Sequence, residues 1–116
     1  MSTKDIAKQF TDALNTGDFA KAESFWSDDV VSIEAQAGDM HEVRGRQAVH
    51  GKGDWWTANH EVHSFETHGP YVNGDQFALD FKMDITRKQT GERVQMEEVG
   101  LYTVRNDKIV EERFFY

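Results

Sequence analysis

The chain has 116 residues, and a length of about 100–150 residues is typical of one domain, so we expect a single domain over residues 1–116. Its net charge of −8 disfavours nucleic acid and anionic membranes as partners, and the absence of cysteine excludes disulfides, thiolate catalysis and cysteine-ligated zinc. No apolar run approaches the roughly 20 residues of a membrane span, and the first residues lack the apolar core of a signal peptide. We therefore expect a cytoplasmic protein without a membrane partner.

Two helices are predicted at the N-terminus. Ser2 and Asp5 have capping-box spacing, and Gly17 is placed to end the first helix in a left-handed conformation. Asp18 can cap the second helix, which is expected to close at residues 27–29. The predicted buried face of this second helix comprises Phe19, Ala22, Phe25 and Trp26.

The middle of the chain is expected to hold a strand, a loop and a third helix. Val30–Ala35 alternates like a strand, and the polar segment Gln36–Gly45 is typical of a loop. A helix is predicted over Arg46–Asn59, although Gly51 and Gly53 each cost it about 1 kcal/mol relative to alanine.

From His60 onward the apolar pattern has period 2, which indicates strands. They are expected over His60–His68, Gln76–Arg87, Arg93–Arg105 and Ile109–Tyr116, with a tight turn at residues 73–75. The fold class is therefore α+β, with three N-terminal helices packed on a curved, mostly antiparallel sheet. We expect this arrangement to form a cone with an internal pocket.

Several segments resemble the SnoaL-like family of the nuclear transport factor 2-like superfamily. The similar segments, which together span the chain, are 13–18, 25–31, 45–49, 102–104 and 108–116. The resemblance implies a cone-shaped α+β barrel that often forms dimers. Members include polyketide cyclases, ketosteroid isomerases, scytalone dehydratase, limonene epoxide hydrolase and non-catalytic binding modules, so the resemblance alone does not assign a function.

The chain departs from the ketosteroid isomerases of this superfamily. Phe10 stands where they carry a tyrosine, Ala35 or Glu34 where they carry the base aspartate, and Gly100 where they carry a second, protonated aspartate. Because enolisation in those enzymes needs a phenol, a base and a neutral acid, we reject their chemistry for this chain.

Alternation along the last two strands points to Glu98, Tyr102 and Glu112 as candidate catalytic residues. Each shares a strand face with apolar side chains, and similarity to steroid-binding relatives implies that these faces line the pocket. Burial and a neighbouring carboxylate both raise a carboxyl pKa, which would suit general acid–base catalysis. Two alternatives remain open: a β-bulge at Gly100 that turns Glu98 outward, or a structural ion pair with an arginine.

Histidines gather at the start of the sheet. His60 and His63 are three residues apart, so one is expected to face the pocket and the other solvent. His63 shares its face with Phe65 and is the preferred inward imidazole, a surface position or a bond to a carboxylate being the alternative. No metal-binding spacing is present, and we expect no metal.

The expected ligand-binding residues are mostly aromatic. Relatives place aromatic pocket walls on the third helix, where only one of two adjacent tryptophans can face inward. The full set of candidates is Trp55, Trp56, Phe81, Met96, Phe114 and Tyr116. No glycine-rich phosphate loop follows a strand, so no nucleotide cofactor is expected.

Three functional hypotheses follow. The first is a cofactor-independent isomerase, cyclase, dehydratase or hydrolase that acts on an apolar or aromatic oxygenated metabolite. The second is a ligand-binding module with the same pocket and no turnover, and the third is a structural dimerisation unit with a filled pocket. A homodimer is expected through the outer sheet face, where Val99 and Leu101 lie.

Overall fold

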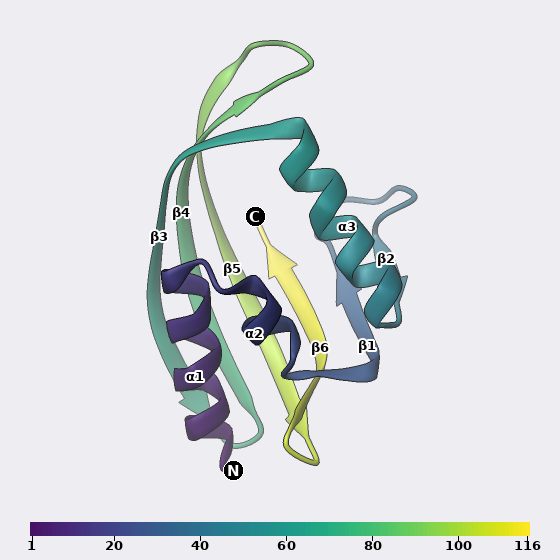
Figure 1. Ribbon diagram of the computed structural model, residues 1–116, viewed down its shortest axis with the longest axis vertical. Coiled ribbons are helices and arrows are strands. Elements are labelled where there is room, and N and C mark those ends of the chain that lie inside the picture. Colours follow the sequence, from purple (N-terminus) through teal and green to yellow (C-terminus); the bar gives the residue numbers. More distant parts are fainter.

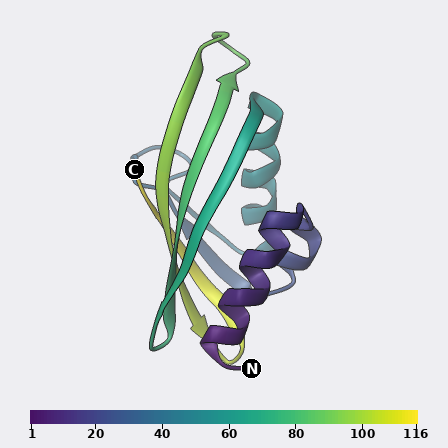
Figure 2. The same ribbon diagram turned by 90° about the vertical axis from the view of Figure 1, so that its left-hand side faces the viewer.

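The structure, a computed structural model, describes residues 1–116 and consists of one sheet with all three helices on the same face (Figures 1 and 2). The helices are α1 (Thr3–Thr16), α2 (Phe19–Glu23) and α3 (Arg46–Asn59). The strands are β1 (Trp26–Ile33), β2 (Glu42–Arg44), β3 (His60–Asn73), β4 (Gln76–Arg87), β5 (Arg93–Arg105) and β6 (Lys108–Phe115). None of the helices is long and apolar enough to cross a membrane.

The first helix forms as its ends predict. The backbone N–H of Asp5 donates to Ser2 Oγ at 3.1 Å, and the backbone N–H of Ser2 donates to Asp5 Oδ2 at 3.2 Å. Gly17 ends α1 at φ 76°, a left-handed conformation that glycine adopts without steric cost. Helix α1 buries Ile6 and Phe10 against the sheet.

The second helix is shorter than expected, and the placement of Trp26 on it was wrong. α2 ends at Glu23, and Trp26 is the first residue of β1. The backbone N–H of Ile109 in β6 donates to the carbonyl of Phe25 at 2.7 Å, so the chain has already joined the sheet there. Phe19 is also exposed, whereas Ala22 and Phe25 are buried as predicted.

The segment predicted as a loop contains a short strand. β2 pairs antiparallel with β1, Val43 lying opposite Ser32. Val43 packs against the core, which explains why a mostly polar segment holds a strand. The predicted strand of residues 30–35 begins earlier, at Trp26, and ends at Ile33.

The sheet has the order β2-β1-β6-β5-β4-β3 and is antiparallel except for the parallel pair β1–β6. It is mixed and does not close on itself, so the expected cone is an open, curved sheet with helices on its concave side (Figure 2). The bounds predicted for α3, β4 and β5 are confirmed. As predicted, alternate residues of β4 enter the core: Phe77, Leu79, Phe81, Met83 and Ile85.

Candidate functional site

Glu98 lies on the inner face of the sheet. It is opposite Phe81 of β4, and the pairing of β4 with β5 is continuous from Gln76 with Thr103 to Thr86 with Arg93. The alternative of a bulge at Gly100 is therefore excluded, and Glu98 shares the face of the buried residues of β4. No arginine pairs with it.

Glu112 also points inward and is 8% exposed. Its strand, β6, lies between β5 and β1, so Glu112 has Tyr102 of β5 on one side and Ser32 of β1 on the other. The fully buried Ser32 hydroxyl donates to Glu112 Oε2 at 2.8 Å. Glu112 thus has a hydrogen-bond donor, whereas only burial and nearby charges act on the Glu98 carboxyl.

Lys52 of α3 joins this cluster, although it is not among the residues predicted from the sequence. Its Nζ donates to Ser32 Oγ at 2.6 Å and lies 2.7 Å from Glu34 Oε1. It also lies 5.3 Å from the ring centroid of Phe114. Lys52 follows Val49 by three residues and precedes Trp56 by four, so helical spacing could have placed it on the inner face.

Tyr102 completes the cluster and depends on the glycine two residues before it. A Cβ at Gly100 would lie 3.0 Å from both Cε2 and the hydroxyl of Tyr102, so the phenol lies directly over Gly100. Tyr102 is 2% exposed, and burial and carboxylate charges, with no hydrogen bond, raise the pKa of its phenol well above 10. The hydroxyl is therefore a neutral donor without a protein acceptor.

The two candidate carboxyls differ in the cause and size of their pKa shifts. Burial, and after it the charge of Glu34, raises the pKa of Glu98 from 4.5 to about 7, with Lys52 opposing the shift. Burial also raises the pKa of Glu112, but only to about 6, because the Ser32 hydrogen bond and the Lys52 charge oppose it. The Glu98 carboxyl, which has no hydrogen-bond donor, therefore has the more strongly raised pKa of the two.

Apolar side chains border the carboxyls on the inner face. Phe81 is buried, and Met96, Phe114 and Trp56 are partly buried against the core. Val62 and Phe65 of β3 lie opposite Ile85 and Met83 on this face, yet they are 44% and 41% exposed. The inner face at Val62 and Phe65 is therefore only partly covered by other side chains of the protein.

The prediction that His63 faces inward was wrong. The pairing of β3 with β4 shifts between Val62 and Ser64, so His63 and Phe65 lie on opposite faces despite their spacing of two. His63 is exposed, and its Nε2 lies 2.7 Å from Thr86 Oγ1. The inward histidine is His60, which stacks on Trp56 with ring centroids 4.5 Å apart.

Two further candidates lie at the border of the cluster or away from it. Trp55 is 47% exposed, so Trp56 is the inward member of the tryptophan pair. The hydroxyl of half-exposed Tyr116 donates to Glu34 Oε2 at 3.0 Å.

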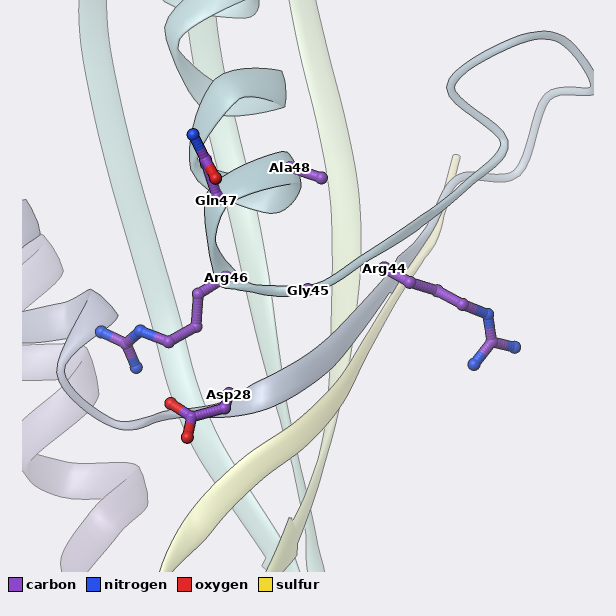
Figure 3. A pocket seen from close by; sticks show the side chains of 6 residues that line it. All are labelled: Asp28, Arg44, Gly45, Arg46, Gln47 and Ala48. Carbon is purple, nitrogen blue, oxygen red and sulfur yellow. The ribbon is translucent and has the colours of Figure 1, made fainter.

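Two surface hollows lie apart from this cluster. One of about 550 Å³ lies at the start of α3, where Asp28 and residues 44–48 surround it (Figure 3). Arg46 is engaged there, since it donates to the carbonyl of Trp26 at 2.6 Å. The other, of about 780 Å³, lies at the ends of β1, β5 and β6. No three histidine, aspartate or glutamate side chains converge to hold a metal ion.

Comparison with known proteins identifies the family. The model of the SnoaL-like domain matches residues 1–116. A SnoaL-like candidate polyketide cyclase from Mesorhizobium loti, also described as a carbohydrate phosphatase, is 56% identical, with 100% of each chain covered and a TM-score of 0.96.

More distant structures share the fold. A protein of unknown function with a cystatin-like fold from Xanthomonas campestris is 25% identical over 99% of this chain and 90% of its own, with a TM-score of 0.81. An NTF2-like protein from Burkholderia thailandensis is 15% identical over the same shares, with a TM-score of 0.86. No curated protein matches. The chain belongs to the SnoaL-like family and has the fold of the nuclear transport factor 2-like superfamily.

Proposed function

We propose that this chain is an enzyme of small-molecule, cofactor-independent acid–base chemistry, with Glu98 as the group that transfers the proton. The substrate is an apolar or aromatic oxygenated metabolite, and the reaction is an isomerisation, cyclisation, dehydration or hydrolysis. The supporting observation is that Glu98 faces the concave side without a hydrogen-bond or ion-pair partner, while Glu34 and Glu112 are both bonded.

The environment of Glu98 suits proton transfer at neutral pH. A general acid or base works best when its pKa lies near the working pH, and burial raises the pKa of Glu98 to about 7. Burying an unpartnered carboxylate is costly, so such a group is more often kept for chemistry than for stability.

Tyr102 and Glu112 have different roles in this proposal. The Tyr102 hydroxyl is a neutral donor without a protein acceptor, so it can donate to an oxygen of the substrate. Glu112 is bonded to Ser32 and acts as a fixed charge behind the phenol. The uncovered apolar side chains of Val62 and Phe65 provide surface for the apolar body of a ligand.

A ligand-binding module without turnover is the second candidate. No imidazole lies beside Glu98, because His63 faces outward and His60 stacks on Trp56. The phosphatase description of the Mesorhizobium loti protein is less well supported for this chain. Three carboxylates face one ammonium in the cluster, and that charge repels a phosphate ester.

Assembly and location belong to the same proposal. The chain is one domain that acts in the cytoplasm as a homodimer. The dimer forms through the outer sheet face, where Val99 is 37% exposed and Leu101 is partly exposed beside the exposed Phe115. The absence of helices from this face and the apolar side chains exposed on it support the proposal.

The experiment is a turnover screen with matched variants. The wild type, Glu98→Gln and Glu97→Gln are incubated with a panel of oxygenated aromatic and terpenoid compounds, and products are detected by mass spectrometry. Glu97 directly precedes Glu98 in β5 but is exposed on the outer face, so its variant controls for charge removal alone.

If the chain is an enzyme, the wild type and Glu97→Gln are expected to convert a substrate, and Glu98→Gln is expected to lose at least a hundredfold in rate. General acid–base catalysis typically contributes a factor of about 10²–10⁴ to the rate. Compounds that bind to the wild type without any conversion support the binding module instead. Equal conversion by the wild type and Glu98→Gln contradicts the role of Glu98.

A further inference from the structure

Lys52 is the only cation in direct contact with this cluster: it pairs with Glu34 and reaches Glu112 through Ser32, while it acts on Glu98 through its charge alone. Its Nζ lies 2.7 Å from Glu34 Oε1 and donates to Ser32 Oγ at 2.6 Å. The Ser32 hydroxyl in turn donates to Glu112 Oε2 at 2.8 Å. One side chain of α3 therefore connects Glu34, which directly follows β1, with Glu112 of β6 through the Ser32 hydroxyl.

The hydrogen bonds that link Lys52, Ser32 and Glu112 all have the same direction, from Lys52 toward Glu112. A hydroxyl has one hydrogen to donate, and Ser32 gives it to Glu112 because its lone pair accepts from Lys52. Two of the three ammonium hydrogens are thus directed to Glu34 and Ser32. Glu98 receives none of them and interacts with Lys52 only through its charge.

We propose that Lys52 is the positioning residue of this site: it orders Ser32 and Glu112 into one bonded chain and keeps Glu112 ionised, so that Glu98 is the carboxyl that exchanges a proton with the ligand. This inference rests on the proposed function, because it assigns the division of labour between two carboxyls of the same site.

The location of Lys52 strengthens its electrostatic effect on the carboxyl of Glu112. Its side chain is 13% exposed and lies over the ring of Phe114, so little water screens its charge. A hydrogen bond to the charged form of a carboxyl and a nearby opposite charge both favour ionisation, and Glu112 receives both. The other titratable groups near the Lys52–Ser32–Glu112 chain are Glu34, Tyr102 and Tyr116, and Glu23 acts on Glu112 through its charge.

The experiment is a ¹³C NMR titration of protein with labelled glutamate side chains, in which Glu98→Gln and Glu112→Gln assign the two carboxyl signals. Lys52→Met is expected to raise the titration midpoint of Glu112 by about one pH unit and that of Glu98 by less, because Lys52 acts on Glu112 through the Ser32 hydrogen bond as well as through its charge. Ser32→Ala is expected to raise the midpoint of Glu112 and to leave that of Glu98 nearly unchanged. Lys82→Met, a change of an exposed lysine on the outer face of β4, is the control and shifts neither midpoint.

Conservative rescue separates positioning from packing. Lys52→Arg keeps the positive charge, so both midpoints are expected to stay near those of the wild type. If Lys52→Met does not fold, Ser32→Ala decides, because it breaks the chain and retains the lysine. An unmoved Glu112 midpoint in Lys52→Met or in Ser32→Ala overturns the proposal.

The two proposals fail separately. If the midpoints move as expected while Glu98→Gln retains full turnover, the positioning role of Lys52 stands and the catalytic role of Glu98 falls. If Glu98→Gln abolishes turnover while Glu112 titrates independently of Lys52 and Ser32, the positioning role falls alone.

Discussion

Replacing Glu98 with leucine is expected to stabilise the protein in neutral and alkaline solution. The folded carboxyl has a pKa raised by burial from 4.5 to about 7, so the folded state binds its proton more tightly than the unfolded state. Ionisation therefore costs stability as the pH rises from about 4.5 to about 7, and the full cost is present above that window. Leucine has no such cost and suits the apolar surroundings.

The magnitude follows from the shift. At about 1.4 kcal/mol per pKa unit the shift from 4.5 to about 7 gives an upper limit of about 3.5 kcal/mol, and partial exposure of the side chain reduces it to about 2 kcal/mol. Urea unfolding at pH 5, 6, 7 and 8 measures it. The stability of Glu98→Leu relative to the wild type should increase from pH 5 to pH 8 by about 2 kcal/mol.

The control is Glu97→Leu, which changes an exposed carboxylate on the other face of the same strand. Its stability relative to the wild type should vary little over this pH range. A stability difference between Glu98→Leu and the wild type that is constant with pH would refute the reasoning. Destabilisation by several kcal/mol at pH 8 would instead indicate that Glu98 holds a buried cation in place.

Three further outcomes are expected. Gly100→Ala should destabilise the protein by about 1–3 kcal/mol in urea unfolding, because its Cβ would lie 3.0 Å from the Tyr102 hydroxyl, and wild-type stability would show that the phenol moves freely. Trp56→Leu should weaken binding of any ligand found in the screen about tenfold, whereas Trp55→Leu, a change of an exposed residue, should not. Equal effects of the two changes would show that Trp56 does not contact the ligand. Light scattering should give twice the chain mass of 13.3 kDa, and Val99→Glu should give a monomer; a monomeric wild type at micromolar concentration contradicts the outer-face dimer.

The fold was predictable because its signals are local. The change from period 3.6 to period 2 near His60 separates helices from sheet, and the bounds of α3, β4 and β5 agree with the prediction. The end of α2 was not predictable from periodicity. Trp26 suits a buried helix face and a strand equally well, and the bond from Ile109 to Phe25 that decides between them joins residues far apart in sequence.

The site was predictable only in part. Alternation correctly places Glu98 and Tyr102 on the inner face, because no bulge interrupts the pairing of β4 with β5. It also places Glu112 correctly, because the register shift between β5 and β6 falls before Glu111 and leaves Glu112 opposite Tyr102. It fails for His63, because one extra residue in β3 reverses the facing without any signal from glycine or proline. Lys52 was missed because an ammonium on an inner helix face has meaning only once its partners on β1 and β6 are placed.

The most direct test of the central claim is the protonation midpoint of Glu98 itself. A ¹³C NMR titration of the wild type, with the signal assigned by its loss in Glu98→Gln, measures the midpoint without a substrate. The burial of Glu98 beside other carboxylates predicts a midpoint pKa of about 7, above that of Glu112 at about 6. A Glu98 midpoint near 4.5, the ordinary value of an exposed glutamate, would contradict the account.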